Sequence, residues 1–185
     1  MVRVARGRRP ASQGDPILVE LLIILGLVLL NGMLSGAEIA VVALRKTRVE
    51  KLVNEGHSAA KAIKRLQNNP ERFLATVQIG ITVIGATAGA FGGVSFTRDL
   101  APLIATVPGL ATYAEEIALA VVITLISYLT IVLGELVPKS LALRAAEPYA
   151  LVASRPLVAL AWIARPFVWL LSASSNLVLR LFGDR

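Results

Sequence analysis

The sequence predicts an all-α membrane protein with three transmembrane helices and further helices at the membrane surface. Hydrophobic residues make up 56% of the 185-residue chain, and the mean hydropathy is +0.71, whereas soluble domains hold about 45–50% apolar residues. The apolar residues form long runs, and three of these reach the roughly 20 residues that a membrane-crossing helix needs. The third run ends on a glutamate, Glu135, at a depth where a carboxylate usually faces protein, water or a bound cation.

The composition excludes several kinds of site. The chain has no cysteine, so disulfides, thiolate metal sites and cysteine nucleophiles are ruled out. Its one histidine, His57, lies in a polar segment, so this chain alone cannot build a histidine proton relay within the membrane. The net charge of +7 comes from basic segments beside the apolar runs, where such residues mark the cytoplasmic side. We therefore expect a lipid bilayer as a partner and no nucleic acid.

The first span is expected at 17–44, after a basic tail at 1–16 that we expect to be disordered. Its second half is interrupted by Asn31, Ser35 and Glu38. At 100° per residue these three positions share one face of a helix. A polar stripe on an otherwise apolar helix faces protein or water rather than lipid.

Residues 45–72 are expected to form a polar amphipathic segment that lies on the cytoplasmic side. The segment contains eight lysines or arginines and an apolar stripe with helical spacing. Its end is marked by Asn68-Asn69-Pro70. Proline is favoured at the first position of a helix, so the next helix should begin at Pro70.

The second span is expected at about 73–96. Small residues with four-residue spacing, which let helix backbones approach closely in lipid, are Gly85 with Gly89 and Ala86 with Ala90. Gln78, Thr82 and Gly85 share one face by the same arithmetic. Five glycines between positions 80 and 93 also favour a local break, which would free backbone carbonyls to act as ligands.

The third span is expected at about 117–137 and ends in a polar turn. A carboxylate at the centre of a membrane costs about 2.5–3.5 kcal/mol on insertion scales. The turn around Glu135 also contains a helix-breaking glycine and proline and a cation, Gly134, Pro138 and Lys139. We interpret this combination as a built site and not as a stray charge.

The remaining residues, 140–185, are expected to form juxtamembrane helices. Prolines at positions 148, 156 and 166 divide the segment into apolar runs, which are shorter than the roughly 20 residues of a span. Trp162 and Trp169 suit helices at the membrane interface. A short fourth span at 167–182 remains an alternative.

Charge counting predicts the orientation of the spans in the cell membrane. With the N-terminus outside and the C-terminus in the cytoplasm, fourteen lysines and arginines lie on the cytoplasmic side, against five for the reverse orientation. The four arginines of the N-terminal tail oppose this assignment. In the favoured orientation Asn31, Ser35, the 80–82 segment and Glu135 all approach the inner half of the bilayer. Oxygen ligands without sulfur or imidazole suit a hard cation such as Mg²⁺ or Ca²⁺, with Na⁺ also possible.

Three blocks of this sequence together resemble a known family. They read LNGMLSGAEIAVVALRKTRVEKL, NPERFLATVQIGITVIGATAGAFGG and LGELVPKSLALR. In this order, from about residue 25 to 145, they are similar to the transmembrane domain of the CNNM/CorC family, the cyclin M-type magnesium transporters. The Asn-x₃-Ser block and the glutamate–proline turn carry the resemblance together.

The resemblance implies a homodimer of three-span subunits that exports Mg²⁺ in exchange for entering Na⁺. It also implies that Pro138 ends the helix behind the glutamate. The implied Mg²⁺ ligands are the side chains of Asn31, Ser35 and Glu135 and the carbonyl oxygens of Gly80 and Ile81. Family members continue into paired CBS domains that bind ATP, and this chain stops before them. ATP is therefore expected only through domains that this chain lacks.

Each candidate ligand also has a purely structural interpretation. Glu135 could pair with Lys139 one helical turn later, which is worth about 0.3–0.5 kcal/mol where the pair is exposed. Asn31 and Ser35 could hydrogen-bond between helices, typically for about 0.6 kcal/mol each. With the resemblance, the ligand role is favoured for all three residues.

Other polar residues are expected near the ion without binding it directly. Glu38 could line the ion path or pair with Arg45. Gln78 and Thr82 are expected just behind the ligands, and Pro138 and Lys139 beside the glutamate.

Three functional hypotheses follow from these observations. The favoured one is a Na⁺-coupled Mg²⁺ transporter, with no enzymatic activity. The second is a Mg²⁺ sensor or membrane anchor that does not transport and presents cytoplasmic regulatory domains. The third, an intramembrane hydrolase, is disfavoured because Ser35 has no histidine or lysine partner at its depth and no paired carboxylates share a level.

Overall fold

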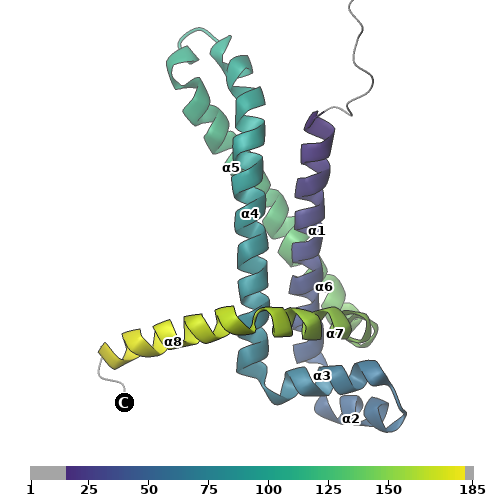
Figure 1. Ribbon diagram of the computed structural model, residues 1–185. Coiled ribbons are helices and arrows are strands. Elements are labelled where there is room, and N and C mark those ends of the chain that lie inside the picture. Colours follow the sequence, from purple (N-terminus) through teal and green to yellow (C-terminus); the bar gives the residue numbers. More distant parts are fainter. Residues whose placement is uncertain (1–15, 182–185) are drawn as a thin grey trace, which may run out of the picture.

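The computed structural model of the chain describes residues 16–181, which form helices joined by short turns. Three long helical stretches run together as a bundle, and shorter helices gather at one end (Figure 1). We call this the α2–α3 end, and we call the opposite end, where a turn joins two spans, the 106–113 end. The tail expected at 1–16 lies outside the described residues, apart from Pro16.

The first two spans are the helices α1 (Pro16–Ala43) and α4 (Pro70–Ala105). At 1.5 Å per residue they are about 42 and 54 Å long, more than the roughly 30 Å of a hydrocarbon core. The third span is the helical stretch Ala111–Arg144, and all three are apolar enough to cross a membrane. The expectation of an all-α chain with three candidate spans is therefore confirmed.

The expected break in the second span is not present. α4 is helical through all five of its clustered glycines and begins with Pro70 in its first turn. Glycine lowers helix propensity by only about 1 kcal/mol, and in lipid an open backbone group costs more than that. The membrane environment thus keeps the helix intact.

The third span changes geometry at the polar turn instead of ending there. It consists of a short 3₁₀ turn η1 (Ala111–Tyr113), α5 (Ala114–Ile131), a π-helical turn η2 (Val132–Leu136) and α6 (Val137–Arg144). The expectation that Pro138 ends the helix is wrong, because the proline occupies the first turn of α6. There its missing N–H is tolerated.

The segment between the first two spans forms two helices and not one. α2 (Lys46–Asn54) and α3 (Ser58–Asn68) fold back on each other at the α2–α3 end. The turn between them contains Gly56 with φ +90°, a conformation that glycine adopts without strain. Both helices direct an apolar face toward the spans, with Val49 and Ile63 fully buried.

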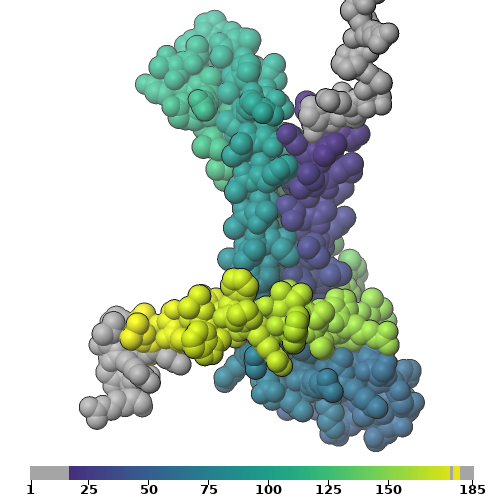
Figure 2. Space-filling view, in the orientation of Figure 1, coloured from purple at the N-terminus to yellow at the C-terminus, as the bar shows by residue number. Residues whose placement is uncertain are grey.

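The last two helices run across the spans. α7 (Ala146–Ile163) and α8 (Arg165–Leu181) form a band over the front of the bundle in Figures 1 and 2, and α8 points away from it. Pro156 lies inside α7 and does not divide it, contrary to the expectation from the proline positions. α7 and residues 165–179 together are apolar enough for a bent span with a 61° bend, but their transverse direction fits a membrane-surface position.

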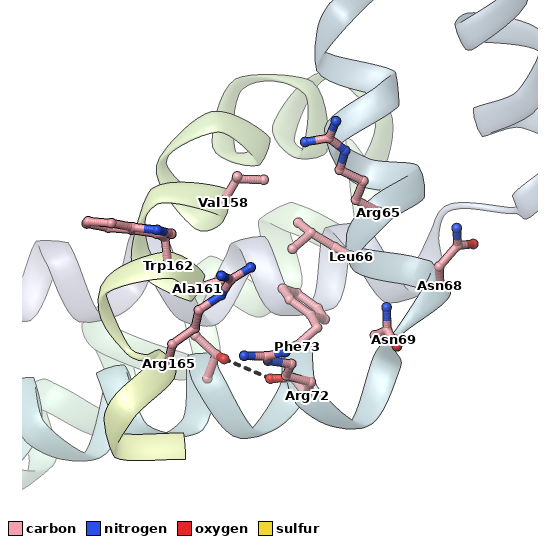
Figure 3. Close-up of a pocket in the computed structure, with 11 residues that line it drawn as sticks. Arg65, Leu66, Asn68, Asn69, Arg72, Phe73, Val158, Ala161, Trp162 and Arg165 are labelled. Atoms are coloured by element: carbon pink, nitrogen blue, oxygen red, sulfur yellow. Dashed lines mark hydrogen bonds between the residues drawn. The ribbon is translucent and has the colours of Figure 1, made fainter. Parts of the chain in front are cut away.

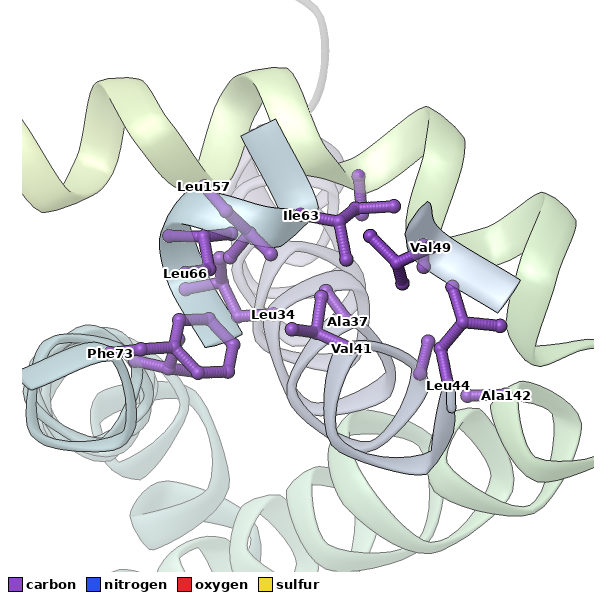
Figure 4. Close-up of a cluster of buried hydrophobic side chains, with 14 of the residues drawn as sticks. Leu34, Ala37, Val41, Leu44, Val49, Ile63, Leu66, Phe73, Ala142 and Leu157 are labelled. Atoms are coloured by element: carbon purple, nitrogen blue, oxygen red, sulfur yellow. The ribbon is translucent and has the colours of Figure 1, made fainter. Parts of the chain in front are cut away.

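The main apolar core lies at the α2–α3 end (Figure 4), where side chains of α1 meet those of α3, α4 and α7. The C-terminus of α1 is closed by a polar contact: the Gln67 amide donates hydrogen bonds to the carbonyls of Val41 (2.8 Å) and Leu44 (2.7 Å). These carbonyls have no helical donor of their own. Gln67 therefore ties α3 to the end of the first span.

A second, smaller apolar cluster lies toward the 106–113 end. It joins Ile24 and Val28 of α1 to Val122 and Ile126 of α5, all at most 6% exposed. Gly92 of α4 completes it, because a side chain there would meet Ile24 and Ile126. We call this group the apolar seal.

Candidate cation site

The π-helical turn is the feature that organises the polar residues. Within it the Val137 N–H donates to the Val132 carbonyl, five residues earlier, where an α-helix would use four. Pro138 has no N–H and cannot serve Gly134, the residue four positions before it. The widened turn before a proline therefore leaves carbonyl groups short of donors, which is common at functional sites.

One of these carbonyls is bound by the first span. The Asn31 side-chain amide donates a buried hydrogen bond of 3.0 Å to the Gly134 carbonyl. An unmade buried hydrogen bond costs about 1–3 kcal/mol, so Asn31 supplies what Pro138 cannot. The amide oxygen of Asn31 points elsewhere and has no hydrogen-bond partner among the described residues.

Two glycines allow α1 to lie this close to the turn. A Cβ at Gly32 would stand 2.8 Å from Pro138 Cγ and 3.0 Å from the Leu133 carbonyl oxygen. At Gly36 it would stand 2.5 Å from the Tyr149 hydroxyl and 3.1 Å from the Pro138 carbonyl oxygen. A Cβ at Gly32 would be blocked by the rigid proline ring, and one at Gly36 would require the Tyr149 side chain to move. The Gly-x₃-Gly spacing of this pair is a sequence signal for close helix packing, although it was not among the expected features.

Three buried oxygen atoms near the turn have no partner in the described part of the chain: Asn31 Oδ1, Ser35 Oγ and Thr130 Oγ1. Asn31 and Ser35 are 1% and 0% exposed. Thr130 lies beside the turn, since its methyl is 3.5 Å from the Cβ position of Gly134. A buried polar group without a partner is costly and needs an explanation. Thr130 escaped the sequence analysis because a lone threonine in an apolar run gives no signal.

The position of Ser35 follows from its two neighbours on α1. Leu34 lies against Gly80 of α4, with 3.0 Å between its Cδ1 and the Cβ position of that glycine, and Gly36 lies against Pro138. Ser35 therefore faces the interior between α4 and the π turn. Positions 24, 28, 31 and 35 share one face of α1, so the apolar seal stands directly above this polar pair.

Glu135 lies within the turn itself. Its side chain is 37% exposed, and Lys139 Nζ lies 3.6 Å from its Oε2. The structural interpretation of Glu135 as one half of an i,i+4 pair therefore describes the present geometry. Such a pair at a partly open position is weak, so it leaves the carboxylate available to another cation.

The α4 candidates lie apart from the glutamate turn. No Cα atom of α4 comes within 8 Å of a Cα in residues 132–144, all of which the structure describes. Gly80 packs on Leu34 and Leu160, and Ile81 is buried in the main core. Both residues lie within the unbroken α4, so their carbonyls are placed to accept backbone bonds. In this conformation α1 and α5 each contact both regions.

The other polar residues that the sequence suggested also lie on two different helices, α4 and α1. Gln78 and Thr82 face a shallow apolar pocket that α4 shares with Val168 and Leu171 of α8. Glu38 is half-buried on the stripe of α1, and within residues 16–181 it makes no ion pair with Arg45. Its position below Ser35 is compatible with an ion path.

The chemistry available at this site is limited to oxygen. Within residues 16–181, no group of three or more histidine, cysteine, aspartate or glutamate side chains lies close enough to hold a metal ion. The polar groups within or beside the deformed helical turn are one carboxylate, one amide oxygen and two hydroxyls. Oxygen donors with little charge suit hard cations, bound weakly enough to leave again.

The fold and this turn define a class: a helical membrane domain with three candidate spans and polar groups buried between them. The cyclin M transmembrane N-terminal domain matches residues 22–184. Because that match covers most of the chain, the chain belongs to this family. The resemblance inferred from the sequence is thereby confirmed.

Curated relatives agree with this assignment. UPF0053 protein sll0260 of Synechocystis is 43% identical over 165 residues, which cover 89% of this chain and 37% of the relative. UPF0053 protein YhdP of Bacillus subtilis is 33% identical, over 90% of this chain and 37% of the relative. UPF0053 inner membrane protein YfjD of Escherichia coli is 26% identical over 80% of this chain. The chain thus spans about a third of the length of each of these relatives.

Proposed function

We propose that this chain is the membrane domain of a transporter whose substrate is Mg²⁺. The observation that carries the proposal is the set of three buried, unpartnered oxygen atoms beside the π turn, on Asn31, Ser35 and Thr130. Asn31 bonds the carbonyl of Gly134, and the next residue, Glu135, is a carboxylate whose present partner is a weakly held lysine. A small cation that gives up part of its water shell would satisfy these oxygens and displace Lys139 from Glu135.

The implied carbonyl ligands Gly80 and Ile81 require a different arrangement of α4. Because α1 and α5 each contact both α4 and the turn, a shift of α4 along these two helices would change the distance between the two groups of ligands. We propose that binding draws α4 toward the turn, as alternating access in transporters requires relative motion of helices around one site.

Export of Mg²⁺ and coupling to Na⁺ entry belong to the same proposal.

The face of α4 that carries small residues could form a dimer contact, because added Cβ atoms at Gly85 and Gly89 would meet nothing within 4 Å. In lipid such open faces favour close helix contacts. A second copy of the chain would cover this face in the proposed homodimer.

The alternative is a Mg²⁺ sensor or membrane anchor that does not transport. It uses the same oxygens and predicts binding without flux. The half-exposed Arg48–Glu147 contact joins α2 to α7 by two guanidinium–carboxylate hydrogen bonds of 2.7 Å each. This contact would make the α2–α3 end a rigid support for further domains. Flux measurements separate the two functions.

The decisive experiment is Glu135→Gln in proteoliposomes loaded with a Mg²⁺-sensitive dye under a Na⁺ gradient. We expect the variant to lose Na⁺-dependent Mg²⁺ flux and to lower Mg²⁺ affinity at least tenfold, since a neutral amide binds a divalent cation poorly. Glu50→Gln, on the exposed side of α2, is the matched control and should behave as wild type. Flux that survives Glu135→Gln rejects the assignment, and binding without flux in the wild type supports the sensor.

A second experiment tests the hydroxyl that only the structure identifies. Thr130→Val removes an unpartnered buried oxygen, whereas Thr124→Val removes one that already donates 2.7 Å to the Ala120 carbonyl of its own helix. We expect Thr130→Val to weaken Mg²⁺ binding several-fold and Thr124→Val to leave it unchanged. Equal effects would show that Thr130 is not near the bound ion.

The orientation is testable because the chain has no cysteine. Single substitutions Glu55→Cys and Val107→Cys place a thiol at the α2–α3 end and at the 106–113 end, respectively. With the N-terminus outside, a membrane-impermeant maleimide added to intact cells should label position 107 and not position 55. The reverse pattern would invert the proposed topology.

A further inference from the structure

A second polar feature lies apart from the π turn, where α3, α4, α7 and α8 meet. It is an open pocket of about 460 Å³. Figure 3 shows three arginines around it, Arg65 from α3, Arg72 from the first turn of α4 and Arg165 from the start of α8. Asn69 and Trp162 complete its rim, and we call the group the arginine pocket.

The charge in the arginine pocket is unbalanced. None of its three arginines forms an ion pair within residues 16–181, and no carboxylate lines the cavity. Two other arginines have carboxylate partners, since Arg48 binds Glu147 and Arg98 lies 3.7 Å from Glu20, whereas Arg45 and Arg144 form no ion pair within residues 16–181. Three unpaired guanidinium groups around one cavity repel each other unless an anion lies between them.

Helix ends of both signs meet at the pocket. α4 begins at Pro70 and α8 at Arg165, whereas α3 ends at Asn68 and α7 at Ile163. The dipoles of starting and ending helices offset each other, so the net charge of the pocket comes from its three arginines. The side chain of Asn69 makes no capping bond at the start of α4, which leaves the first N–H groups of that helix open to an acceptor.

The surroundings of the arginine pocket are those of a membrane surface. α8 runs across the spans (Figure 2), and its apolar side chains Phe167 and Leu170 are more than half exposed. Trp162 at the rim is 69% exposed and Trp169 is 71% exposed. Tryptophans of this kind sit at the level of lipid headgroups, and apolar residues on a surface helix contact acyl chains.

We propose that the arginine pocket binds the phosphate of an anionic phospholipid in the leaflet at the α2–α3 end. Arginine forks match phosphate oxygens, and the exposed apolar side of α8 gives the acyl chains a surface that a free anion would not use. Bound lipid would tie α8 to α3 and α4 and hold the band of α7 and α8 against the membrane.

The test titrates the detergent-solubilised protein with short-chain phosphatidylglycerol and follows binding by native mass spectrometry. Arg65→Gln/Arg72→Gln/Arg165→Gln should weaken binding by about a hundredfold, at roughly fivefold per arginine. The matched control Lys46→Gln/Lys61→Gln/Arg144→Gln removes the same charge from exposed positions outside the pocket. It should stay within about twofold of wild type.

Two further arms complete the test. Phosphatidylcholine and inorganic phosphate should each bind at least tenfold more weakly than phosphatidylglycerol. Inorganic phosphate that binds as tightly would overturn the lipid assignment, and equal losses in the two triple variants would show charge attraction without a site. Should the pocket triple variant fail to fold, Arg72→Gln alone should weaken phosphatidylglycerol binding about fivefold, and an unchanged affinity would reject the proposal.

Discussion

The two halves of the bundle hold the same helices together by opposite means. Toward the 106–113 end, the apolar seal packs isoleucine and valine of α1 and α5 around Gly92 of α4. Toward the α2–α3 end, α1 meets the third span through glycines, a side-chain amide and a carbonyl. The helix is regular beside the seal and π-helical beside the amide. Polar chemistry in this protein thus coincides with a deformed backbone.

The second span distinguishes the two halves further. α4 contacts α5 along the seal, yet none of its Cα atoms approaches the π turn or α6 within 8 Å. The seal therefore joins all three spans at one end, while the buried oxygens lie where α4 stands apart from the third span. A cation bound there would have a closed side and a side that can open.

The largest effect is expected from filling the close contact of the polar half. Gly32→Val would drive side-chain atoms into the Pro138 ring and the Leu133 carbonyl, neither of which can rotate away. We expect a loss of about 3 kcal/mol in the free energy of unfolding, the upper part of the range for overpacking. Unfolding in mixed detergent micelles measures it.

Gly26→Val is the control for this substitution, because nothing lies within 4 Å of a Cβ at that position of the same helix. It carries the same valine propensity cost. Similar losses for both variants would mean that α1 does not approach the turn as closely as the structure indicates.

Weakening the apolar seal should have a smaller effect. Ile126→Ala leaves a gap among Ile24, Val28 and Val122. Lipid is as apolar as the seal, so the substitution costs only the van der Waals packing that the side chain loses. We therefore expect the free energy of unfolding to fall by about 1–2 kcal/mol, which is below the usual range for the core of a soluble protein. Ile131→Ala, at a position that is 52% exposed on the same helix, should cost less. Leakage of ions through the Ile126→Ala variant in liposomes would support a sealing role, and unchanged stability would contradict it.

A double-mutant cycle isolates the amide–carbonyl contact. Asn31→Ala should cost less in a Pro138→Ala background, because residue 138 then has an N–H that can bond the Gly134 carbonyl. We expect a coupling of about 0.6 kcal/mol, typical of hydrogen bonds between membrane helices. Strictly additive losses would mean that Asn31 does not replace the donor that proline lacks.

The smallest effect concerns the contact between α2 and α7. The hydrogen bonds from Arg48 lower the pKa of the Glu147 carboxyl below its ordinary value of 4.5. A carboxyl with a lowered pKa in the folded state adds stability above the ordinary value, and this contribution disappears as the pH falls through the folded value. The thermal midpoint of wild type should therefore exceed that of Glu147→Gln slightly at pH 6.

The same difference should shrink as the pH falls below 4.5, where protonated Glu147 resembles glutamine. Glu50→Gln serves as a comparison, since its carboxylate is 59% exposed and lies 3.6 Å from Lys64. A difference that grows on acidification would contradict the direction of the pKa shift.

Much of the fold could be predicted from the sequence, because each span is recognisable from the length of its apolar run. Twenty apolar residues in a row must be helical in lipid, whatever their neighbours are. The start of α4 at Pro70 and the polar stripe of Asn31 and Ser35 were predicted for the same reason, since both follow from the spacing within one helix.

The errors have one common origin. The break expected among the glycines of α4 and the stop expected at Pro138 both apply single-residue propensities inside a membrane. There, unbroken backbone hydrogen bonding outweighs glycine and proline preferences. Proline is accommodated because a neighbouring helix supplies the missing donor, and no local pattern reveals which residue that will be.

By itself, the sequence determined the three candidate spans and the absence of sulfur ligands, because the apolar length of each helix and the residue types are local properties. Only the tertiary structure decided that Asn31 bonds Gly134, that Gly32 and Gly36 make the contact possible, that Thr130 joins the polar group and that α4 stands apart from Glu135. Those outcomes depend on how closely two backbones approach, and that distance is set by side chains far apart in the chain.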